Sequence, residues 1–232
     1  MATVTLSYED YKVGWICALP LEMTAAIAML DEHHTPLQRA PGDDNNYVLG
    51  RVGEHNVAIA SLPVGERGTN SAAQVAAQML RTFLSITIGL MVGIGSGVPS
   101  SKDIRLGDIV VSKPSNQNGG VFQYDLGKRL PNRFKNFGFL NAPPRVLRSA
   151  ISTLIAWHEI PGQNMIPDYL SPEKNPNLPA RYAYPESEPD RLFKPDYIHG
   201  SQKTCATCDC ENLVDRETRL SGLRSLRQSN HS

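Results

Sequence analysis

The stretch over residues 90–112, LMVGIGSGVPSSKDIRLGDIVVS, places the strongest constraint on the fold. It begins as an apolar strand, turns at Gly93, Gly95 and Gly97, and resumes as a second apolar strand over 107–112. A turn of glycines lets the backbone approach a ligand closely, because no side chain blocks the approach. Open α/β sheets bind their ligands at turns that follow a buried strand. The stretch therefore predicts an α/β sheet with a ligand-binding turn.

Strand and helix patterns alternate along much of the remaining chain. Apolar or alternating runs predict strands, and apolar residues three or four apart predict helices. Gly53-Glu54 predicts a hairpin turn, and Ser71 with Gln74 predicts a helix-capping box. The expected strands cover 12–19, 47–52, 56–62, 87–93, 107–112 and 121–125, and the expected helices cover 21–31, 71–83 and 143–158. This order predicts an α/β fold with a mixed central sheet.

Composition excludes several classes of protein. The chain has 232 residues, enough for one domain with a substantial core. Lys and Arg together number 23, as do Asp and Glu, and this balance argues against a nucleic-acid-binding domain. No apolar run reaches the roughly 18 residues of a membrane span, and the N-terminus lacks a secretory signal. The four cysteines do not form a disulfide framework, so we expect a cytoplasmic protein.

The second half of the chain has a different character. Eight prolines fall over 161–200, which predicts an irregular excursion rather than a helix or strand. The segment over 201–232 is polar, contains three cysteines, and is expected to be poorly ordered. We therefore expect one domain over 8–200, followed by this tail.

Three motifs follow one another in an order that resembles a known superfamily. They are VGWICALPLEMTAAIAMLDE at 13–32, SLPVGERGTNSAAQVAAQML at 61–80 and the stretch at 90–112. With further segments at 121–154 and 204–216, they make about residues 8–216 similar to the purine nucleoside phosphorylase, uridine phosphorylase and nucleosidase superfamily. The resemblance is to fungal members, which often sit at the N-terminus of multidomain proteins. It implies a three-layer fold in which helices flank the mixed sheet.

The resemblance implies cleavage of the N-glycosidic bond between a base and ribose, by water in nucleosidases and by phosphate in phosphorylases. Glu22 ends the A-x-x-x-E pattern that starts at Ala18, and it matches the glutamate that helps to activate the attacking water. A carboxylate beside C1′ is suited to act as a general base. The sequence leaves another interpretation open, in which Glu22 only complements the helix dipole. The nucleosidase-like Glu22 favours purine nucleosides.

Gly93, Gly95, Ser96 and Gly97 form the expected substrate-binding turn, whose N–H groups suit phosphate or the ribose edge. Many members of the superfamily that the sequence resembles have a serine where this chain has Ile94. The Gly-Asp-Pro-x-Arg phosphate motif of bacterial phosphorylases is also replaced, by Ala-Leu-Pro-Leu-Glu. Both departures favour hydrolysis or simple binding over phosphorolysis. The alternative is a tight turn without a ligand.

The resemblance also implies a second substrate loop, PVGERGTN at 63–70. Within it, Gly65 would bring the backbone beside the sugar or phosphate, and Arg67 would hold an anion. The other interpretation is a flexible loop that caps the following helix.

Neither Asp108 nor the cysteine cluster is expected to carry chemistry. Asp108 follows a glycine before a strand, where a turn with a satisfied carboxylate is more common. Cys205, Cys208 and Cys210 supply one half of a zinc site, and a second well-spaced pair is missing from the sequence. We expect no metal and no cofactor, with phosphate as the candidate co-substrate.

Two further features of the superfamily do not follow Arg216 in this sequence. One is a Met-Glu pair that holds the ribose hydroxyls, and the other is a Ser-Asp or Cys-Asp motif whose aspartate protonates the base. The resemblance therefore implies a truncated domain, without its C-terminal strands and helix and with impaired activity. Three functions stay open: an enzyme of nucleoside cleavage, a degenerate module that binds a nucleoside or a partner without turnover, and a metal-stabilised interaction module built on Cys205, Cys208 and Cys210. Members of the superfamily form homo-oligomers, so we also expect self-association.

Overall fold

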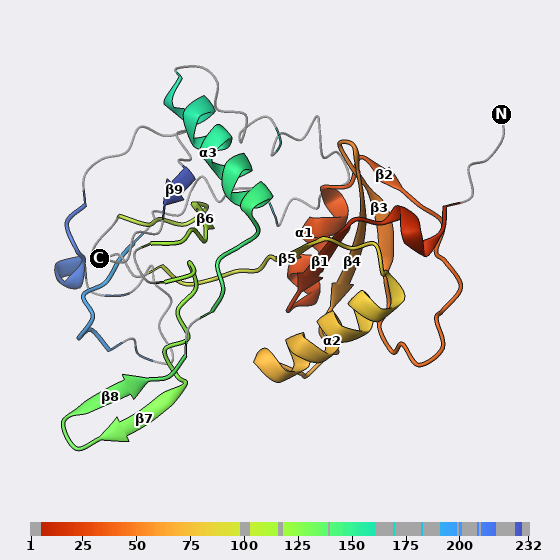
Figure 1. The fold of residues 1–232 in the computed structure, drawn as a ribbon. Helices are drawn as coiled ribbons and strands as arrows, with labels where there is room; N and C mark the ends of the chain where they lie inside the picture. The colour runs from red at the N-terminus through yellow and green to blue at the C-terminus, as the bar shows by residue number, and fades with distance from the viewer. Residues whose placement is uncertain are drawn as a thin grey trace. The chain divides into compact units, whose positions relative to one another are not determined.

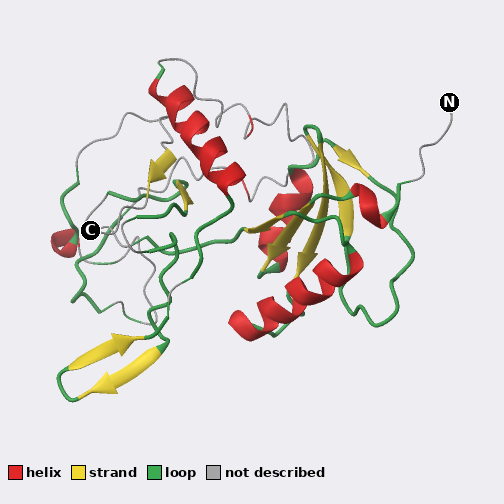
Figure 2. Cartoon of the chain, in the orientation of Figure 1, coloured by secondary structure: helices red, strands yellow, loops and turns green. Residues whose placement is uncertain are grey.

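The computed structural model describes residues 6–97, 103–115, 118–138, 140–160, 169, 182, 191–198, 200, 208, 210–216 and 226–228 (Figure 1). The described residues up to Ser96 form one compact unit, and those from Gly97 onward form a second. Strands and helices occur in both units (Figure 2). In the described part of the chain, no helix has the length and apolar character that crossing a membrane requires.

The first unit is built around a five-stranded sheet with the order β2-β3-β4-β1-β5. Its elements are η1 (Tyr8–Asp10), β1 (Val13–Cys17), α1 (Pro20–Ala28), β2 (Glu32–His33), β3 (Val48–Val52), β4 (His55–Ser61), α2 (Thr69–Thr82) and β5 (Ile88–Met91). β1 lies between β4 and β5 and is parallel to both, whereas β3 is antiparallel to β2 and β4. The predicted mixed sheet is therefore confirmed.

Two helices cover the two faces of this sheet (Figure 1). Successive residues of a strand point to opposite faces, so Val57 and Ala58 of β4 face opposite ways. Val57 belongs to a buried cluster with Ala26 of α1, and Ala58 belongs to another with Met79 of α2. The unit thus has three layers, α1, sheet and α2, as the sequence predicted.

Local sequence explains where the helices begin. Pro20 occupies the first position of α1. A backbone N–H at this position has no partner within the helix, so proline costs the helix no hydrogen bond. α2 begins earlier than predicted, with Gly68 at its N-cap in a left-handed conformation (φ 88°) that glycine favours. The predicted capping box is wrong, because Ser71 lies inside the helix and its hydroxyl donates a 2.5 Å hydrogen bond to Glu66.

The predicted hairpin of β3 and β4 is confirmed, and Gly53 at its turn has φ of 56°. The end predicted for the first helix is wrong, because α1 ends at Ala28 and β2 follows. His33 of β2 pairs with Gly50 of β3. The strands approach so closely that a Cβ on Gly50 would stand 2.5 Å from the carbonyl oxygen of Glu32. Pairing with β3 thus overrides the helical pattern at this point.

Among its described residues, the second unit holds two short strand pairs and one long helix. Its elements are β6 (Ile109–Val111), β7 (Gly127–Leu130), β8 (Arg133–Asn136), α3 (Arg145–Glu159), η4 (Cys210–Asn212) and β9 (Leu226–Gln228). β6 pairs in parallel with β9, and β7 pairs antiparallel with β8. The strand predicted at 107–112 and the helix predicted at 143–158 are confirmed as β6 and α3.

The strand predicted over 121–125 is wrong. That segment is irregular, and the side chain of Asn136 donates to the carbonyl oxygens of Gln123 and Tyr124 at 3.0 and 3.1 Å. Strand pairing begins only at Gly127. A run rich in aromatic and apolar residues suits a strand only where a partner lies alongside, and β8 pairs with the next segment instead.

An ion-paired cluster ties distant parts of the second unit together. Asp103 pairs with Arg105 and with Arg216, each at 2.6 Å. Hydrogen bonds from Arg105 and Arg216 lower the pKa of Asp103 to about 2. Much of the proline-rich excursion and of the tail lies outside the described residues, so the boundaries predicted for the domain (8–200) and the tail (201–232) stay predictions.

Candidate functional site

Most of the predicted site residues lie just after strands that end at one edge of the five-stranded sheet. β1, β4 and β5 are parallel, so their carboxyl ends lie at the same edge. Two backbone hydrogen bonds extend the pairing beyond the strands: Leu62 donates to Cys17 at 3.0 Å, and Val92 donates to Ile16 at 3.1 Å. In open α/β sheets this carboxyl edge is where ligands bind.

Glu22 is the buried acidic residue at this edge, with 8% of its surface exposed. Its Oε2 accepts hydrogen bonds from the N–H groups of Ala18 and Leu19, at 2.7 and 2.9 Å. Its Oε1 accepts a hydrogen bond from the N–H of Ile94, at 2.7 Å. Hydrogen bonds to an ionised acceptor are roughly twice as strong as neutral ones. The carboxylate therefore fixes the loop after β1 to the loop after β5.

Among the glycines of the turn, Gly93 is the one that the contact with Glu22 requires. A Cβ at this position would stand 2.8 Å from Oε1 of Glu22, closer than real Cβ atoms approach other atoms. A Cβ on Gly95 would meet nothing within 4 Å. The glycine-rich turn therefore admits a carboxylate of the protein itself at Gly93, and leaves open space at Gly95.

The rest of the turn is exposed. Gly95 and Ser96 lie at the surface, and Ile94 is 70% exposed. Gly97 belongs to the second unit, where a Cβ on it would stand 2.8 Å from Cγ2 of Ile104. The structure therefore brings Glu22, Gly93 and Ile94 into one group and assigns Gly97 to the other unit.

The loop between β4 and α2 carries the two remaining predicted residues. Gly65 has φ of 91°, a conformation that side chains rarely adopt and that helps the chain turn toward α2. Arg67 is exposed, and it makes no hydrogen bond or ion pair within the described ranges. Its guanidinium group is therefore available to an anionic ligand at the carboxyl edge.

Two residues of β1, Trp15 and Cys17, lie on the face covered by α1 and were not predicted as part of the site. Burial, together with the negative charge of Glu22, raises the pKa of the Cys17 thiol to about 11. The buried Nε1 of Trp15 has no hydrogen-bond partner among the described residues. Both residues fit the apolar pattern of a buried strand, so the sequence gives no signal for them. At neutral pH the thiol is protonated and packs as a small apolar group.

No group of three or more His, Cys, Asp or Glu side chains is arranged for a metal ion within the portion of the chain that is described. Cys208 is buried, whereas Cys205 and the side chain of Cys210 lie outside that portion. Asp108 accepts a 3.0 Å hydrogen bond from the N–H of Arg105. This is the satisfied turn carboxylate that the sequence predicted.

A curated relative is 46% identical to this chain over 221 residues, which is 94% of the chain. It is a nucleotide-binding leucine-rich repeat (NLR)-like protein from Hyaloscypha variabilis. The chain spans 21% of that relative, so it is similar to one segment of a much longer protein. No profile of a known protein family matches the chain, and no solved structure matches it.

Proposed function

We propose that the carboxyl edge of the five-stranded sheet binds a purine nucleoside and hydrolyses its N-glycosidic bond, as in the nucleosidase branch of the superfamily that the sequence resembles. The observation that carries the proposal is the contact of Glu22 with the glycine-rich turn at Gly93 and Ile94. This contact unites the first and third motifs of the resemblance. The second motif supplies the loop with Arg67 after the neighbouring strand, β4.

Glu22 retains capacity for a water molecule. A carboxylate has about four acceptor positions, and the three N–H groups leave one of them on Oε1. A water held there would attack C1′ as the bond from C1′ to the base breaks, and Glu22 would take up the proton of that water. The departing base would take a proton from solvent.

Hydrolysis suits this edge better than phosphorolysis. Ile94 offers its N–H to Glu22 and has no hydroxyl group for a phosphate. Arg67 would hold the hydroxyl groups of the ribose, or phosphate if phosphate is the co-substrate. The absence of a phosphate-binding serine therefore leaves water as the simplest nucleophile.

A second function, nucleoside binding without turnover, is favoured by the same three hydrogen bonds. A carboxylate that holds two loops in place performs a structural task whether or not it takes part in chemistry. The relative is consistent with this function, because its name describes nucleotide binding and the chain corresponds to a fifth of it (21%). In such a protein this domain would act as one recognition part among several.

Release of free base from adenosine, inosine and uridine, with and without phosphate, tests the proposal on the purified chain. We expect release from the purine nucleosides without phosphate. Release only with phosphate would show phosphorolysis and contradict the role given to Ile94. Calorimetric binding of a nucleoside without release would support the second function. A folded protein that neither binds nor cleaves any of the three would refute both.

A further inference from the structure

The neutral net charge of the chain conceals an uneven distribution of charge. Between Leu126 and His158 the sequence contains no Asp or Glu. The basic residues of this segment are Lys128, Arg129, Arg133, Lys135, Arg145 and Arg148. None of their side chains makes a hydrogen bond or an ion pair within the described part of the second unit. The first four lie on the hairpin of β7 and β8.

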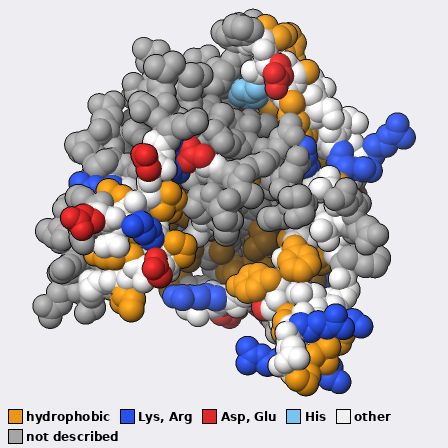
Figure 3. All heavy atoms as spheres, turned by 90° about the vertical axis from the view of Figure 1, so that its left-hand side faces the viewer, with side chains coloured by type: hydrophobic (Ala, Val, Ile, Leu, Met, Phe, Trp, Pro, Cys, Tyr) orange, Lys and Arg blue, Asp and Glu red, His pale blue; other side chains and the backbone are white. Residues whose placement is uncertain are grey.

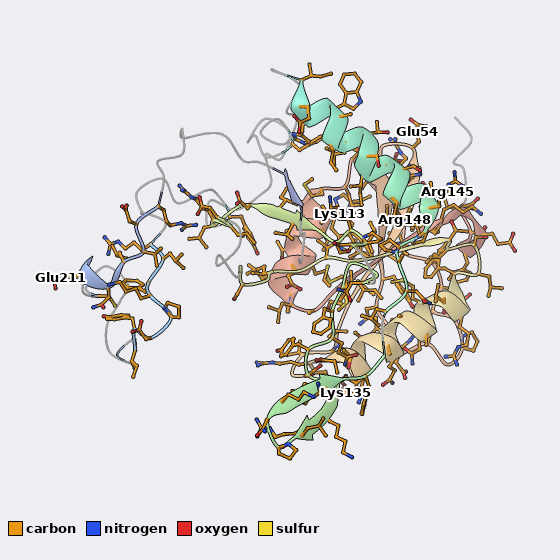
Figure 4. All side chains as sticks on the ribbon, turned by 60° about the vertical axis from the view of Figure 1, so that its left-hand side comes forward. Glu54, Lys113, Lys135, Arg145, Arg148 and Glu211 are labelled. Carbon is orange, nitrogen blue, oxygen red and sulfur yellow. The ribbon has the colours of Figure 1, made fainter. Side chains whose placement is uncertain are left out.

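The pairing of the two strands concentrates this charge. Lys128 lies directly opposite Lys135, and the next pair on the same face is Leu130 with Arg133. Like charges directly opposite each other destabilise a sheet, and an isolated two-stranded hairpin is marginally stable in water. Three cations on one face of a small hairpin therefore favour a bound polyanion, which would relieve their repulsion. Figure 4 shows the Lys135 side chain on this hairpin.

Exposed aromatic rings accompany the cations. Phe134 lies opposite Arg129 on the other face and is 44% exposed. At the base of the hairpin, Phe122 and Phe137 line a small hollow of about 100 Å³ and are 52% and 49% exposed, and nearby Tyr124 is 78% exposed. Basic and apolar side chains lie side by side at the lower right of the space-filling view (Figure 3).

We propose that the β7–β8 hairpin and the aromatic residues at its base bind single-stranded nucleic acid. Cations that track the phosphates, combined with aromatic rings on which bases stack, are the two components of sequence-tolerant single-strand binding. An acidic protein segment would use the cations and leave the rings without a flat partner. A hairpin that inserts into a membrane surface needs an apolar turn, whereas the turn of this hairpin is Pro131-Asn132 flanked by Arg133. The partner is thus a strand that carries both phosphates and bases.

Fluorescein-labelled oligouridylate, titrated with the full chain at a series of salt concentrations, tests this inference. Each phosphate contact in a single strand contributes about −0.7 to the slope of log K against log salt, so the three cations on one face of the hairpin give a slope of about −2. Lys128→Gln with Lys135→Gln should remove about two thirds of this slope and weaken binding about tenfold or more at low salt. Phe134→Leu should weaken binding several-fold without changing the slope.

A matched control removes the same amount of charge elsewhere in the second unit. Arg145→Gln with Arg148→Gln changes two exposed cations of α3, which Figure 4 also labels, and should leave the affinity for oligouridylate within about twofold. Circular dichroism of each variant checks that the fold persists. Equal losses in the control and hairpin variants would overturn the assignment to the hairpin.

Three further outcomes would overturn the proposal. The first is no salt-dependent binding of oligouridylate by the folded chain. The second is a pair of results: inorganic polyphosphate competes at equal phosphate concentration, and Phe134→Leu has no effect on binding. Together they would show a site that binds polyanions without contacting bases. The third is tighter association with phosphatidylserine vesicles than with oligouridylate, which would show a membrane-binding surface.

Discussion

Oε1 of Glu22 and the backbone N–H of Ile94 lie 2.7 Å apart although 72 positions separate the two residues in sequence. The donor is a main-chain group, so the contact does not depend on the side chain at position 94, which is 70% exposed. The glycine before it leaves room for the carboxylate. The link between the two loops would therefore be the same with a serine or an isoleucine at this position, and isoleucine offers no hydroxyl group.

Glu22→Gln should lower the free energy of unfolding by about 1–3 kcal/mol, because a neutral amide has one acceptor oxygen for three part-buried N–H donors. Urea denaturation followed by circular dichroism measures this loss. Glu54→Gln is the matched control, because Glu54 is exposed in the turn between β3 and β4 and is labelled in Figure 4. Equal stability of the two variants would contradict the structural role of Glu22. Glu22→Gln should also abolish any release of base, if release occurs.

Gly93→Ala should destabilise the first unit by about 1–3 kcal/mol, since its new methyl group would overlap Oε1 of Glu22. Gly95→Ala adds the same group two positions away, where nothing lies within 4 Å, and should be close to neutral. Comparing the urea midpoints of Gly93→Ala and Gly95→Ala tests this expected difference in stability. Similar midpoints for the two variants would show that the turn yields to the added methyl group.

Asp43 should make stability depend on pH in the acid range. It is 3% exposed, and although burial opposes its charge, hydrogen bonds from Thr82, Asn45 and Tyr47 lower its pKa below 3.8. A carboxyl whose pKa is depressed by folding stabilises the protein above its unfolded pKa, and this stability is lost as pH falls through the folded value. The urea midpoint should therefore fall as pH drops below about 4.

The variant Asp43→Asn tests this assignment. It should destabilise the chain at pH 7 by about 1–3 kcal/mol and remove part of the decline in acid. Asp44→Asn is the neighbouring control, because the Asp44 side chain is 83% exposed and its ion pair with Arg39 lies at the surface. Exposed pairs contribute about 0–1 kcal/mol. A steeper acid dependence in Asp43→Asn than in the parent chain would be incompatible with the depressed pKa.

Cys17 should resist alkylation in the folded chain. Its pKa of about 11, against 9.0 for an ordinary thiol, reduces the reactive thiolate about a hundredfold at pH 8, and the residue is fully buried. Iodoacetamide labelling followed by peptide mapping gives its rate, and labelling in urea gives the unfolded reference. Glu22→Gln removes a nearby negative charge and should raise the rate. Fast labelling of Cys17 in the native chain would contradict its burial.

Much of the first unit could be predicted from the sequence because its signals are local. Apolar runs located β1 and β5, a glycine turn located the hairpin of β3 and β4, and helical spacing located α2. The errors fall where a partner in space decides. Glu32 and His33 lie in a strand because β3 is beside them, and the segment over 121–125 is irregular because β8 pairs with the residues that follow.

The candidate site was predictable in its residue types and only partly in its geometry. The motifs pointed to Glu22, Arg67 and the glycine turn, and the parallel order of β1, β4 and β5 places the loops that carry them along one edge. Nothing in the sequence distinguished Gly93, which the carboxylate requires, from Gly95, which faces open space. The sequence likewise gave no sign that the charge of Glu22 contributes to the raised pKa of Cys17.

The sequence by itself determined the class of fold and the positions of most strands and helices, because hydrophobic periodicity and turn residues act over a few neighbours. Tertiary structure alone decided that three backbone N–H groups converge on Glu22, and that Lys128 stands opposite Lys135. Both outcomes depend on the register in which separate segments meet. Register is fixed by packing and pairing across the fold, and no single segment of the sequence contains it.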